Sequence, residues 1–290
     1  MGMKLSITAI ALAGLASITS ACMPTDIGYE VPCESPQKIE SRNIRSIEDA
    51  RTLPSTCFKI TETLEITGTA LTDMSLFDGL KEVKNLIIKD NNNLTSLNGF
   101  NYVIVRGDLI IDGNPNLRKL EGITPDTTLT NLFIQHNDSL ESITGFDDLK
   151  TIKNEFRFVN NAKLTSLKAL KRVETIGDVL EISDNTGLKK IGGFGRLSGP
   201  KKMLFVNNSS LTTIDGFSAP LFSIEELRIK NNRALTTAFA LSGNLETITN
   251  TITIVNNPAL SDCRVADFEE IDYPLGADDI QGNGVAWDPC

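Results

Sequence analysis

The stretch LIIDGNPNLRKLEGI, residues 109–123, decides the fold of this chain. Leu109 and Ile111 alternate with other residues, and a period of two is that of a short strand with one buried face. Asn114 follows where the strand ends, and two further leucines come after it at steps of three residues. An asparagine between two aliphatic pairs has no evident role in a single strand, so its meaning has to come from a larger pattern.

That larger pattern is an internal repeat with the unit L-x-I-x-x-N-x-x-L-x-x-L/I-x-G-F. The asparagine occurs eight times at spacings of 23–25 residues, and a leucine follows each copy three residues later. A repeat in one register indicates equivalent structural units that stack on each other. The repeated asparagines are Asn91, Asn114, Asn137, Asn161, Asn185, Asn208, Asn232 and Asn257.

Each copy contributes one strand and further apolar pairs. Strands stacked at ~4.8 Å form a parallel sheet. A second apolar pair follows each asparagine, and a third closes many copies, as Leu149 and Ile152 do, so each copy turns about three corners around a common core. The expected fold is mainly β, a parallel β-helix-like or leucine-rich-repeat-like solenoid of about nine coils. The strand pairs are Leu64/Ile66, Leu86/Ile88, Leu109/Ile111, Leu132/Ile134, Phe156/Phe158, Leu180/Ile182, Met203/Phe205, Leu227/Ile229 and Ile252/Ile254.

The repeated asparagines are interpreted as a structural column. Each lies at a corner where the chain leaves a strand and where buried backbone groups need hydrogen-bond partners. An inward amide can donate to and accept from those groups, so a ladder of stacked asparagines is expected rather than a catalytic or metal site. A glycine such as Gly99, Gly122 or Gly145 marks another sharp corner, and alanine takes that place at Ala169 and Ala240.

The N-terminus has the features of an export signal. Lys4 precedes an apolar segment, residues 5–18, that is too short to span a bilayer as a helix. The sequence TSAC (residues 19–22) then resembles a bacterial lipobox, although Thr19 stands where leucine is usual.

We therefore expect residues 1–21 to be a signal peptide, with Cys22 lipidated and residues 22–32 forming a tether. Met23 after the cysteine, rather than aspartate, resembles the pattern of outer-membrane lipoproteins. The expected location is the bacterial outer membrane or cell surface, reached through an N-terminal lipid. Ordinary secretory cleavage after Ala21, which would give a secreted protein, is the alternative.

The chain has five cysteines, an odd number that needs an explanation in an exported protein. Lipidation of Cys22 leaves four, and the simplest pairing is Cys33 with Cys57 and Cys263 with Cys290. Each bridge closes a loop of about 25 residues, for which chain entropy predicts a stabilisation of ~3 kcal/mol. An oxidising compartment is where such bridges persist.

A solenoid needs covered ends, because raw sheet edges and core would otherwise face water. We assign residues 61–260 to the coils, and residues 33–60 and 261–290 to the caps. In the first cap, SIEDARTL is expected to form a short helix capped by Ser46. Trp287 is expected to pack into the second cap, where CRVADFEEIDYPL is expected to form a helix whose inward residues are Val265, Phe268 and Ile271.

The repeat unit, its spacing and the cysteine-bridged caps together resemble the receptor L domain over residues 33–290. That domain forms the ligand-binding lobes of insulin- and EGF-type receptors, and bacterial surface lipoproteins also carry it. The resemblance implies a right-handed solenoid related to leucine-rich repeats and a role in binding. The chain departs from those receptors in having no cysteine-rich furin-like segment, no transmembrane helix and no kinase, so receptor signalling is not implied.

Composition argues against several function classes. A formal net charge of −9 with scattered Lys and Arg argues against binding of nucleic acid. His136 is the only histidine and lies at a polar corner, so it is interpreted as a corner residue, and we expect no cofactor and no metal. The acidic pairs Asp147/Asp148 and Asp278/Asp279 lack the spacing of a calcium loop and are interpreted as solvated surface.

The middle outward residues of the strands give the best functional clue. Ile87, Ile110 and Phe133 fall on consecutive coils, and we call them the apolar stripe. A contiguous apolar row on a surface often marks an interaction site, although strands favour such residues anyway. The candidate ligand-binding residues are Ile87, Lys89, Ile110, Phe133, Gln135 and Arg157.

The expected function is that of a non-catalytic surface lipoprotein that binds a protein or glycan partner, for recognition or adhesion. One alternative is a carbohydrate-active β-helix enzyme, which needs carboxylates converging on the outside of one sheet. The outward row offers Glu181 beside Arg157, which predicts a salt bridge, and no carboxylate pair. The other alternative is a structural envelope protein without a specific ligand.

Overall fold

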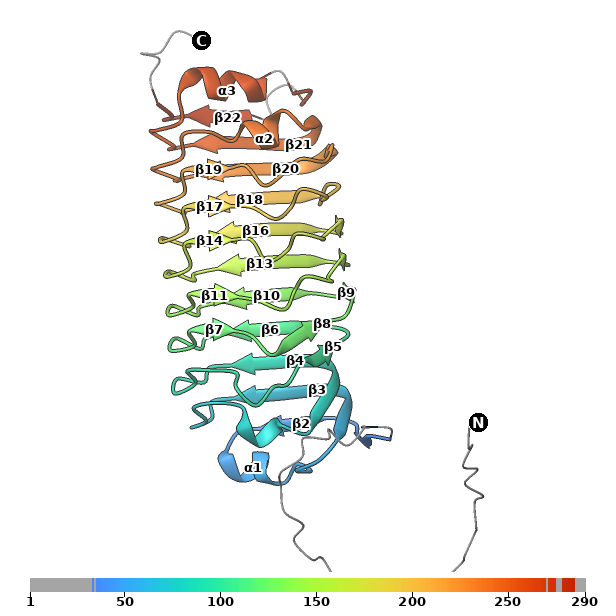
Figure 1. Ribbon diagram of the computed structural model, residues 1–290. Helices are drawn as coiled ribbons and strands as arrows, with labels where there is room; N and C mark the ends of the chain where they lie inside the picture. The colour runs from blue at the N-terminus through green and yellow to red at the C-terminus, as the bar shows by residue number, and fades with distance from the viewer. Residues whose placement is uncertain (1–32, 34, 270, 275–277, 285–290) are drawn as a thin grey trace, which may run out of the picture. The chain divides into compact units, whose positions relative to one another are not determined.

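The computed structural model places most of the chain in a β-solenoid of about 10 coils (Figure 1). The solenoid belongs to the compact unit that begins at Ser35. The fold class predicted from the repeat is thereby confirmed, with one coil more than expected. The described residues are 33, 35–269, 271–274 and 278–284.

Several sequence predictions fall outside the described residues. The signal peptide, Cys22 and the tether lie in residues 1–32, and Trp287 and Cys290 lie in residues 285–290. Among the helices of the described residues, none is both long enough and apolar enough to cross a membrane.

One large parallel sheet runs the length of the solenoid. Its strands follow one another in chain order, one from each coil: β1 (Gln37–Ile39), β3 (Phe58–Thr67), β4 (Leu80–Lys89), β6 (Leu109–Asp112), β10 (Leu132–Gln135), β13 (Glu155–Val159), β16 (Val179–Ser183), β18 (Lys202–Val206), β20 (Phe222–Lys230), β21 (Leu245–Val255) and β22 (Asp278–Gln281). Three further strands join it off this path: β2 (Arg42–Ile44), β5 (Val103–Val105) and β8 (Ile123–Pro125).

Short strands on the other sides of the coils form three small parallel sheets. One side carries β7 (Lys119–Leu120) with β11 (Ser142–Ile143), and then β14 (Ser166–Leu167) with β17 (Lys190–Ile191) and β19 (Thr213–Ile214). We call this the second side. The third sheet comprises β9 (Thr128–Leu129), β12 (Thr151–Ile152) and β15 (Thr175–Ile176). A coil with three strand positions agrees with the three corners expected from the three apolar pairs of the repeat.

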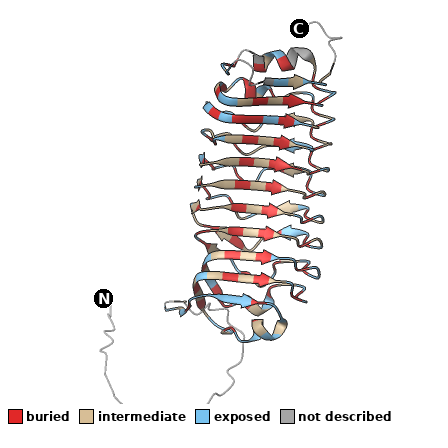
Figure 2. Ribbon diagram, turned by 180° about the vertical axis from the view of Figure 1, so that it is seen from behind, coloured by how far each residue is buried: buried red, intermediate tan, exposed pale blue. Residues whose placement is uncertain are grey.

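The register of the large sheet places each apolar residue beside its counterpart in the next coil. Leu86 pairs with Leu109, Leu109 with Leu132, and Leu132 with Phe156. All four side chains are fully buried. Figure 2 shows the alternation of buried and partly exposed residues along these strands. The core is therefore a stack of aliphatic and aromatic layers, with Phe194 stacked on Phe217 at a centroid distance of 5.4 Å.

The solenoid extends further at both ends than the sequence indicated. β2 pairs with β3 through Arg42 and Leu64, and β22 pairs with β21 through Asp278 and Ile252. The residues expected to form the caps therefore contribute strands to the large sheet, β1 and β2 at one end and β22 at the other, which the apolar pattern did not indicate. The reason is that an end strand has a neighbouring coil on one side only, so polar residues are tolerated and the apolar alternation is weak.

The first cap contains α1 (Ile47–Arg51), as expected. The Asp49 backbone N–H donates to Ser46 Oγ at 3.1 Å, and the Arg45 N–H donates to Asp49 Oδ2 at 2.9 Å. The Asp49 carboxylate thus accepts a hydrogen bond from the backbone N–H of Arg45, the residue before the N-cap, and not from the N–H of Ser46, the N-cap itself. The hydrogen bond that the carboxylate accepts from the Arg45 N–H is the main reason that the pKa of Asp49 lies below its usual value. The expected Cys33–Cys57 disulfide is confirmed.

Three short helical elements remain: η1 (Ser75–Phe77), α2 (Phe239–Ser242) and α3 (Asp262–Glu269). The helix expected in the second cap corresponds to α3, and its inward face is confirmed, because Val265, Phe268 and Ile271 are buried. The side chain of Cys263 and all of Cys290 lie outside the described residues, so that disulfide stays a prediction.

Candidate functional site

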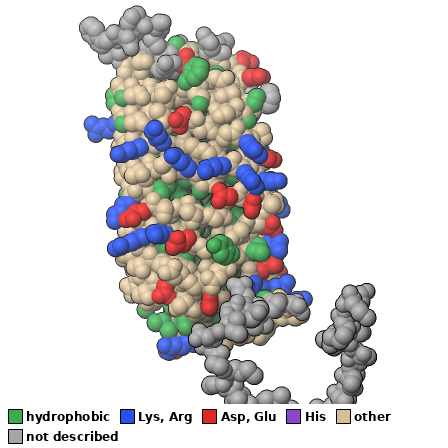
Figure 3. Space-filling model, in the orientation of Figure 1, with side chains coloured by type: hydrophobic (Ala, Val, Ile, Leu, Met, Phe, Trp, Pro, Cys, Tyr) green, Lys and Arg blue, Asp and Glu red, His purple; other side chains and the backbone are tan. Residues whose placement is uncertain are grey.

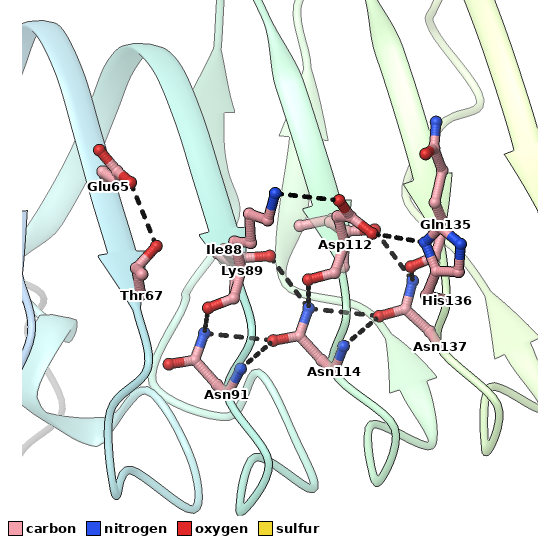
Figure 4. Close-up of polar contacts among 11 residues, drawn as sticks. Glu65, Thr67, Ile88, Lys89, Asn91, Asp112, Asn114, Gln135, His136 and Asn137 are labelled. Atoms are coloured by element: carbon pink, nitrogen blue, oxygen red, sulfur yellow. Dashed lines mark hydrogen bonds and ion pairs between the residues drawn. The ribbon is translucent and has the colours of Figure 1, made fainter.

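The repeated asparagines form the ladder that the repeat predicted (Figure 4). All eight side chains are fully buried. The Asn114 Nδ2 amide donates to Ile88 O at 3.0 Å, to Asp112 O at 3.2 Å and to Asn137 Oδ1 at 3.2 Å. Its own Oδ1 accepts from the Asn91 backbone N–H at 3.2 Å. The Asn114 amide therefore satisfies backbone groups of its own coil and of the preceding coil, and it bonds the side-chain amide of the next coil, so the interpretation as a structural column is confirmed.

Two residues at the ends of the ladder were missed by the sequence reasoning. Thr69 starts it, donating from its N–H and Oγ1 to Asn91 Oδ1 at 2.9 and 2.7 Å. Asn283 ends it, accepting from the Asn257 N–H at 3.2 Å and donating to Ile254 O at 2.7 Å. The residue before every rung of the ladder has a positive φ, which glycine adopts easily. The glycines directly before Thr69 and Asn283 could therefore have identified these two residues as rungs. The residues before the rungs are Gly68, Asp90, Gly113, His136, Asn160, Asp184, Asn207, Asn231, Asn256 and Gly282.

The single histidine belongs to this corner row. His136 has φ 51°, and its Nδ1 lies 2.8 Å from Asp112 Oδ1 (Figure 4). The prediction that it is a corner residue is confirmed. Further along, the exposed Asn207 Nδ2 donates to Asp184 Oδ1 and the Asn231 Nδ2 to Asn207 Oδ1, both at 2.8 Å, so the corners carry a second, outer amide ladder.

The apolar stripe lies on the outer face of the large sheet, seen in Figure 2. The register pairs Ile87 with Ile110, Ile110 with Phe133, and Phe133 with Arg157. The three apolar side chains are half-buried. The prediction that they stand side by side on consecutive strands is confirmed.

One end of the stripe is closed by a fixed arginine. The Arg157 guanidinium carbon lies 5.8 Å from the centroid of the Phe133 ring, a cation–π distance. Its Nε binds Glu155 at 2.7 Å, and its Nη1 binds Glu181 at 3.1 Å, which confirms the predicted Arg157–Glu181 salt bridge. The hydrogen bond from Arg157 to Glu155 is the main reason that the pKa of Arg157 is raised. Glu155 was missed because only the middle position of each strand was considered.

Polar rows flank the stripe on both sides. On one side the Asn131 Nδ2 donates to Asp108 Oδ1 at 2.8 Å, and the Asp108 N–H donates to Asn85 Oδ1 at 2.9 Å. On the other side Lys89 lies 3.6 Å from Asp112, with Gln135 in register beside that carboxylate (Figure 4). The residues predicted to bind a ligand are thus brought together on one face, and the row of Asn85, Asp108 and Asn131 is added to them.

Three glutamates of this face are held by cations: Glu155, Glu181 and Glu226. Glu155 and Glu181 both bind Arg157, and Glu226 lies 3.2 Å from Lys202 and 2.5 Å from Arg228. Within the residues that the structure describes, no group of three or more His, Cys, Asp or Glu side chains is placed to hold a metal ion.

The chain was compared with protein-family models, with curated proteins and with solved structures, and none of the three comparisons finds a match. The resemblance to the receptor L domain therefore stays a prediction from the repeat.

Proposed function

We propose that this protein is a non-catalytic recognition module, exported and lipid-anchored at the bacterial cell surface, which binds a partner protein through the outer face of β4, β6 and β10. The observation that carries the proposal is the apolar stripe, because three large apolar side chains stand in register on consecutive strands of a solvent-facing sheet. Contiguous apolar surface of this kind is uncommon on soluble proteins and often marks an interaction site.

The surroundings of the stripe favour a protein over a glycan. An apolar centre between polar rows, such as those of Asp108 and Asp112, has the anatomy of a protein interface. Stacking of a sugar needs an open aromatic face, whereas the only aromatic residue of the stripe, Phe133, has Arg157 over its ring. The ion pairs that hold Glu155 and Glu181 support a non-catalytic role, because both carboxylates already neutralise one arginine.

The double variant Ile110→Glu/Phe133→Glu is expected to lose the partner while keeping the fold. Both side chains point outward and are half-buried, so the substitution is expected to weaken partner binding more than it destabilises the core. Charges placed in the centre of an interface are expected to weaken binding by at least about tenfold. Cell-surface extracts would be passed over immobilised protein lacking residues 1–22, and the captured protein would be quantified, with circular dichroism as a check of folding.

Leu204→Glu is the matched control for that experiment. Leu204 occupies the same middle position of its strand, and it is half-buried, but it lies three coils beyond Phe133. The control is expected to capture the partner as the unmodified protein does. Capture that survives the double variant, or a captured glycan in place of a protein, would contradict the proposal.

Export and lipidation rest on TSAC (residues 19–22), and the Cys33–Cys57 disulfide supports them, because such bridges persist in oxidising compartments. Mass spectrometry of the mature protein is expected to find a lipidated Cys22 at the N-terminus. Cys22→Ser is expected to abolish the modification and to move the protein from the membrane fraction to the soluble fraction. An unmodified mature N-terminus after cleavage at Ala21 would contradict lipidation and favour secretion.

A further inference from the structure

The second side of the solenoid is interrupted between two successive coils. β11 pairs only with β7, and β14 pairs with β17, so these neighbours in coil order are not joined. Between the other coils from Thr72 to Thr236, a backbone hydrogen bond links each coil to the preceding one, as from Glu141 N–H to Arg118 O at 2.8 Å and from Lys189 N–H to Thr165 O at 2.9 Å. Among the described residues, the equivalent bond from Thr165 to Glu141 is not formed.

Side chains mark the same interruption. Thr212 Oγ1 and Thr236 Oγ1 each donate to a carbonyl of the preceding coil, at 3.0 and 3.1 Å. Thr165 occupies the same position, and no such bond from its hydroxyl is found within the described part of the chain. The large sheet remains paired across these coils through β10 and β13, and the third sheet through β12 and β15, so the opening is confined to the second side.

Ala169 explains why the coils separate here. The corresponding corner residues Gly99, Gly122 and Gly145 have φ values of 107°, 79° and 90°, whereas Ala169 does not have a positive φ. A Cβ at Gly145 would lie 2.5 Å from a carbonyl oxygen of the preceding coil. The methyl group of Ala169 therefore prevents the close approach that glycine allows. At Ala240, the other alanine corner, the strand pairing is an isolated bridge between Thr213 and Thr237, but the bond from Thr236 N–H to Thr212 O is kept at 3.0 Å, so that coil stays joined.

The interruption forms a cleft of about 390 Å³, which we call the β11–β14 cleft. Its walls are residues 141–147 and residues 164–169 with Lys171. Ile143 is only partly buried there, whereas its counterparts Leu120 and Leu167 are buried. The Ser166 hydroxyl oxygen, on the second wall, is shielded from solvent and has no hydrogen-bond partner. Sites for small ligands have volumes of roughly 300–1,000 Å³, so the cleft is large enough for one compact molecule.

The two walls differ in charge and in hydrogen-bonding character. The first wall carries Glu141 and Asp147 and presents the free Glu141 carbonyl, so it accepts hydrogen bonds. The second wall carries Lys168 and Lys171 and presents the free Thr165 N–H, so it donates them. A ligand that matches both walls needs an anionic group at one end and hydrogen-bond donors at the other.

Further cations surround the second wall. Figure 3 shows a band of Lys and Arg side chains across the middle of the face opposite the apolar stripe, on a protein whose net charge is −9. Within the described residues, five exposed lysines of this part of the sequence have no ion-pair partner, so they remain available to an anion: Lys163, Lys168, Lys171, Lys189 and Lys190.

We infer that the β11–β14 cleft binds one acidic sugar unit, a ring with several hydroxyls and a carboxylate. The carboxylate pairs with Lys168 and Lys171, the hydroxyls donate to the Glu141 wall and accept from the Thr165 N–H, and an apolar face of the ring contacts Ile143. A simple inorganic anion is a poorer match, because it accepts hydrogen bonds but leaves the accepting wall without a donor. The site lies away from the apolar stripe and does not depend on the proposed function.

Calorimetry and NMR on the full chain test this inference with glucuronate as the probe. Glucuronate is expected to bind, with shift changes at Thr165 and Ser166, and at least about tenfold more tightly than glucose, which lacks the carboxylate, or than sulfate, which lacks hydroxyls. A short oligoglucuronate is tested beside free glucuronate, to learn whether the site recognises a unit of a polysaccharide or the free sugar acid. Tighter binding of the oligomer and tighter binding of the free acid both support the site. Equal affinity for glucuronate and glucose, or shift changes away from the cleft, would overturn it.

Two variants distinguish binding in the cleft from non-specific attraction by the positive surface charge. Ala169→Gly is expected to let the coils close, to join Thr165 to Glu141 and to abolish glucuronate binding without lowering stability. Lys168→Gln/Lys171→Gln is expected to weaken glucuronate at least about tenfold and leave the weak affinity for glucose unchanged, whereas Lys119→Gln on β7 is expected to bind as the unmodified protein does. Undiminished binding by either cleft variant refutes the assignment.

Discussion

Asn185→Leu is expected to destabilise the protein by roughly 4 kcal/mol, because it leaves several buried backbone groups without partners. The Asn185 Nδ2 amide donates to Phe158 O at 2.8 Å and to Ser183 O at 2.9 Å, and its Oδ1 accepts from the Asn161 N–H at 2.9 Å. Leucine is similar in size, so the loss is one of hydrogen bonds rather than of packing. Urea unfolding followed by circular dichroism measures the change.

Asn93→Leu serves as the control for that substitution. Asn93 lies in the same type of corner, two residues after a rung of the ladder, but its side chain is exposed. Its replacement is expected to change stability by less than about 0.5 kcal/mol. Equal effects of the two substitutions would mean that the amide column contributes little to holding the coils together.

Gly122→Ala is expected to cost roughly 3 kcal/mol and to separate its coil from the preceding one. Gly122 has φ 79°, and a Cβ there would lie 2.3 Å from Phe100 O, so the substitution combines backbone strain with a steric clash. The hydrogen bond from Arg118 N–H to Thr95 O, 3.2 Å long, is expected to weaken in response. Chemical unfolding measures the cost, and amide hydrogen exchange at Arg118 reports the separation.

Gly68→Ala isolates the contribution of strain. Gly68 also has a positive φ, 63°, but no atom lies within 4 Å of the Cβ position. Its replacement is expected to cost only about 1 kcal/mol. If both alanine substitutions cost the same, the close approach of coils at the glycine corner would not be what keeps them together, and the explanation of the β11–β14 cleft would fail with it.

The ladder and the outward rows were predictable because they repeat. With a spacing of 23–25 residues, every Asn and every strand pair occupies the same place in successive coils, so one local interpretation extends to the whole sheet. The register that places Ile87 beside Ile110 and Phe133 follows from the same repetition. Features that depend on the ends did not repeat, and so Thr69 and Asn283 were missed.

The β11–β14 cleft was not predicted from the sequence, for a different reason. The sequence places Ala169 where other copies have glycine, and both are small residues, so the copy looked equivalent. Whether a methyl group fits depends on the distance to a carbonyl oxygen in the neighbouring coil, which a single sequence does not contain. The contact of Arg157 with Phe133 was likewise hidden, because it depends on where Glu155 and Glu181 hold the guanidinium group.

Hydrogen exchange of asparagine side-chain amides, resolved by NMR, tests the buried column most directly. The Nδ2 protons of Asn114, Asn161 and Asn185 are expected to exchange only when the whole solenoid unfolds, because each is enclosed and hydrogen-bonded between coils. The exposed amides of Asn92 and Asn93 are expected to exchange at the rate of a free side chain. Similar, rapid exchange in both groups would contradict the existence of the ladder.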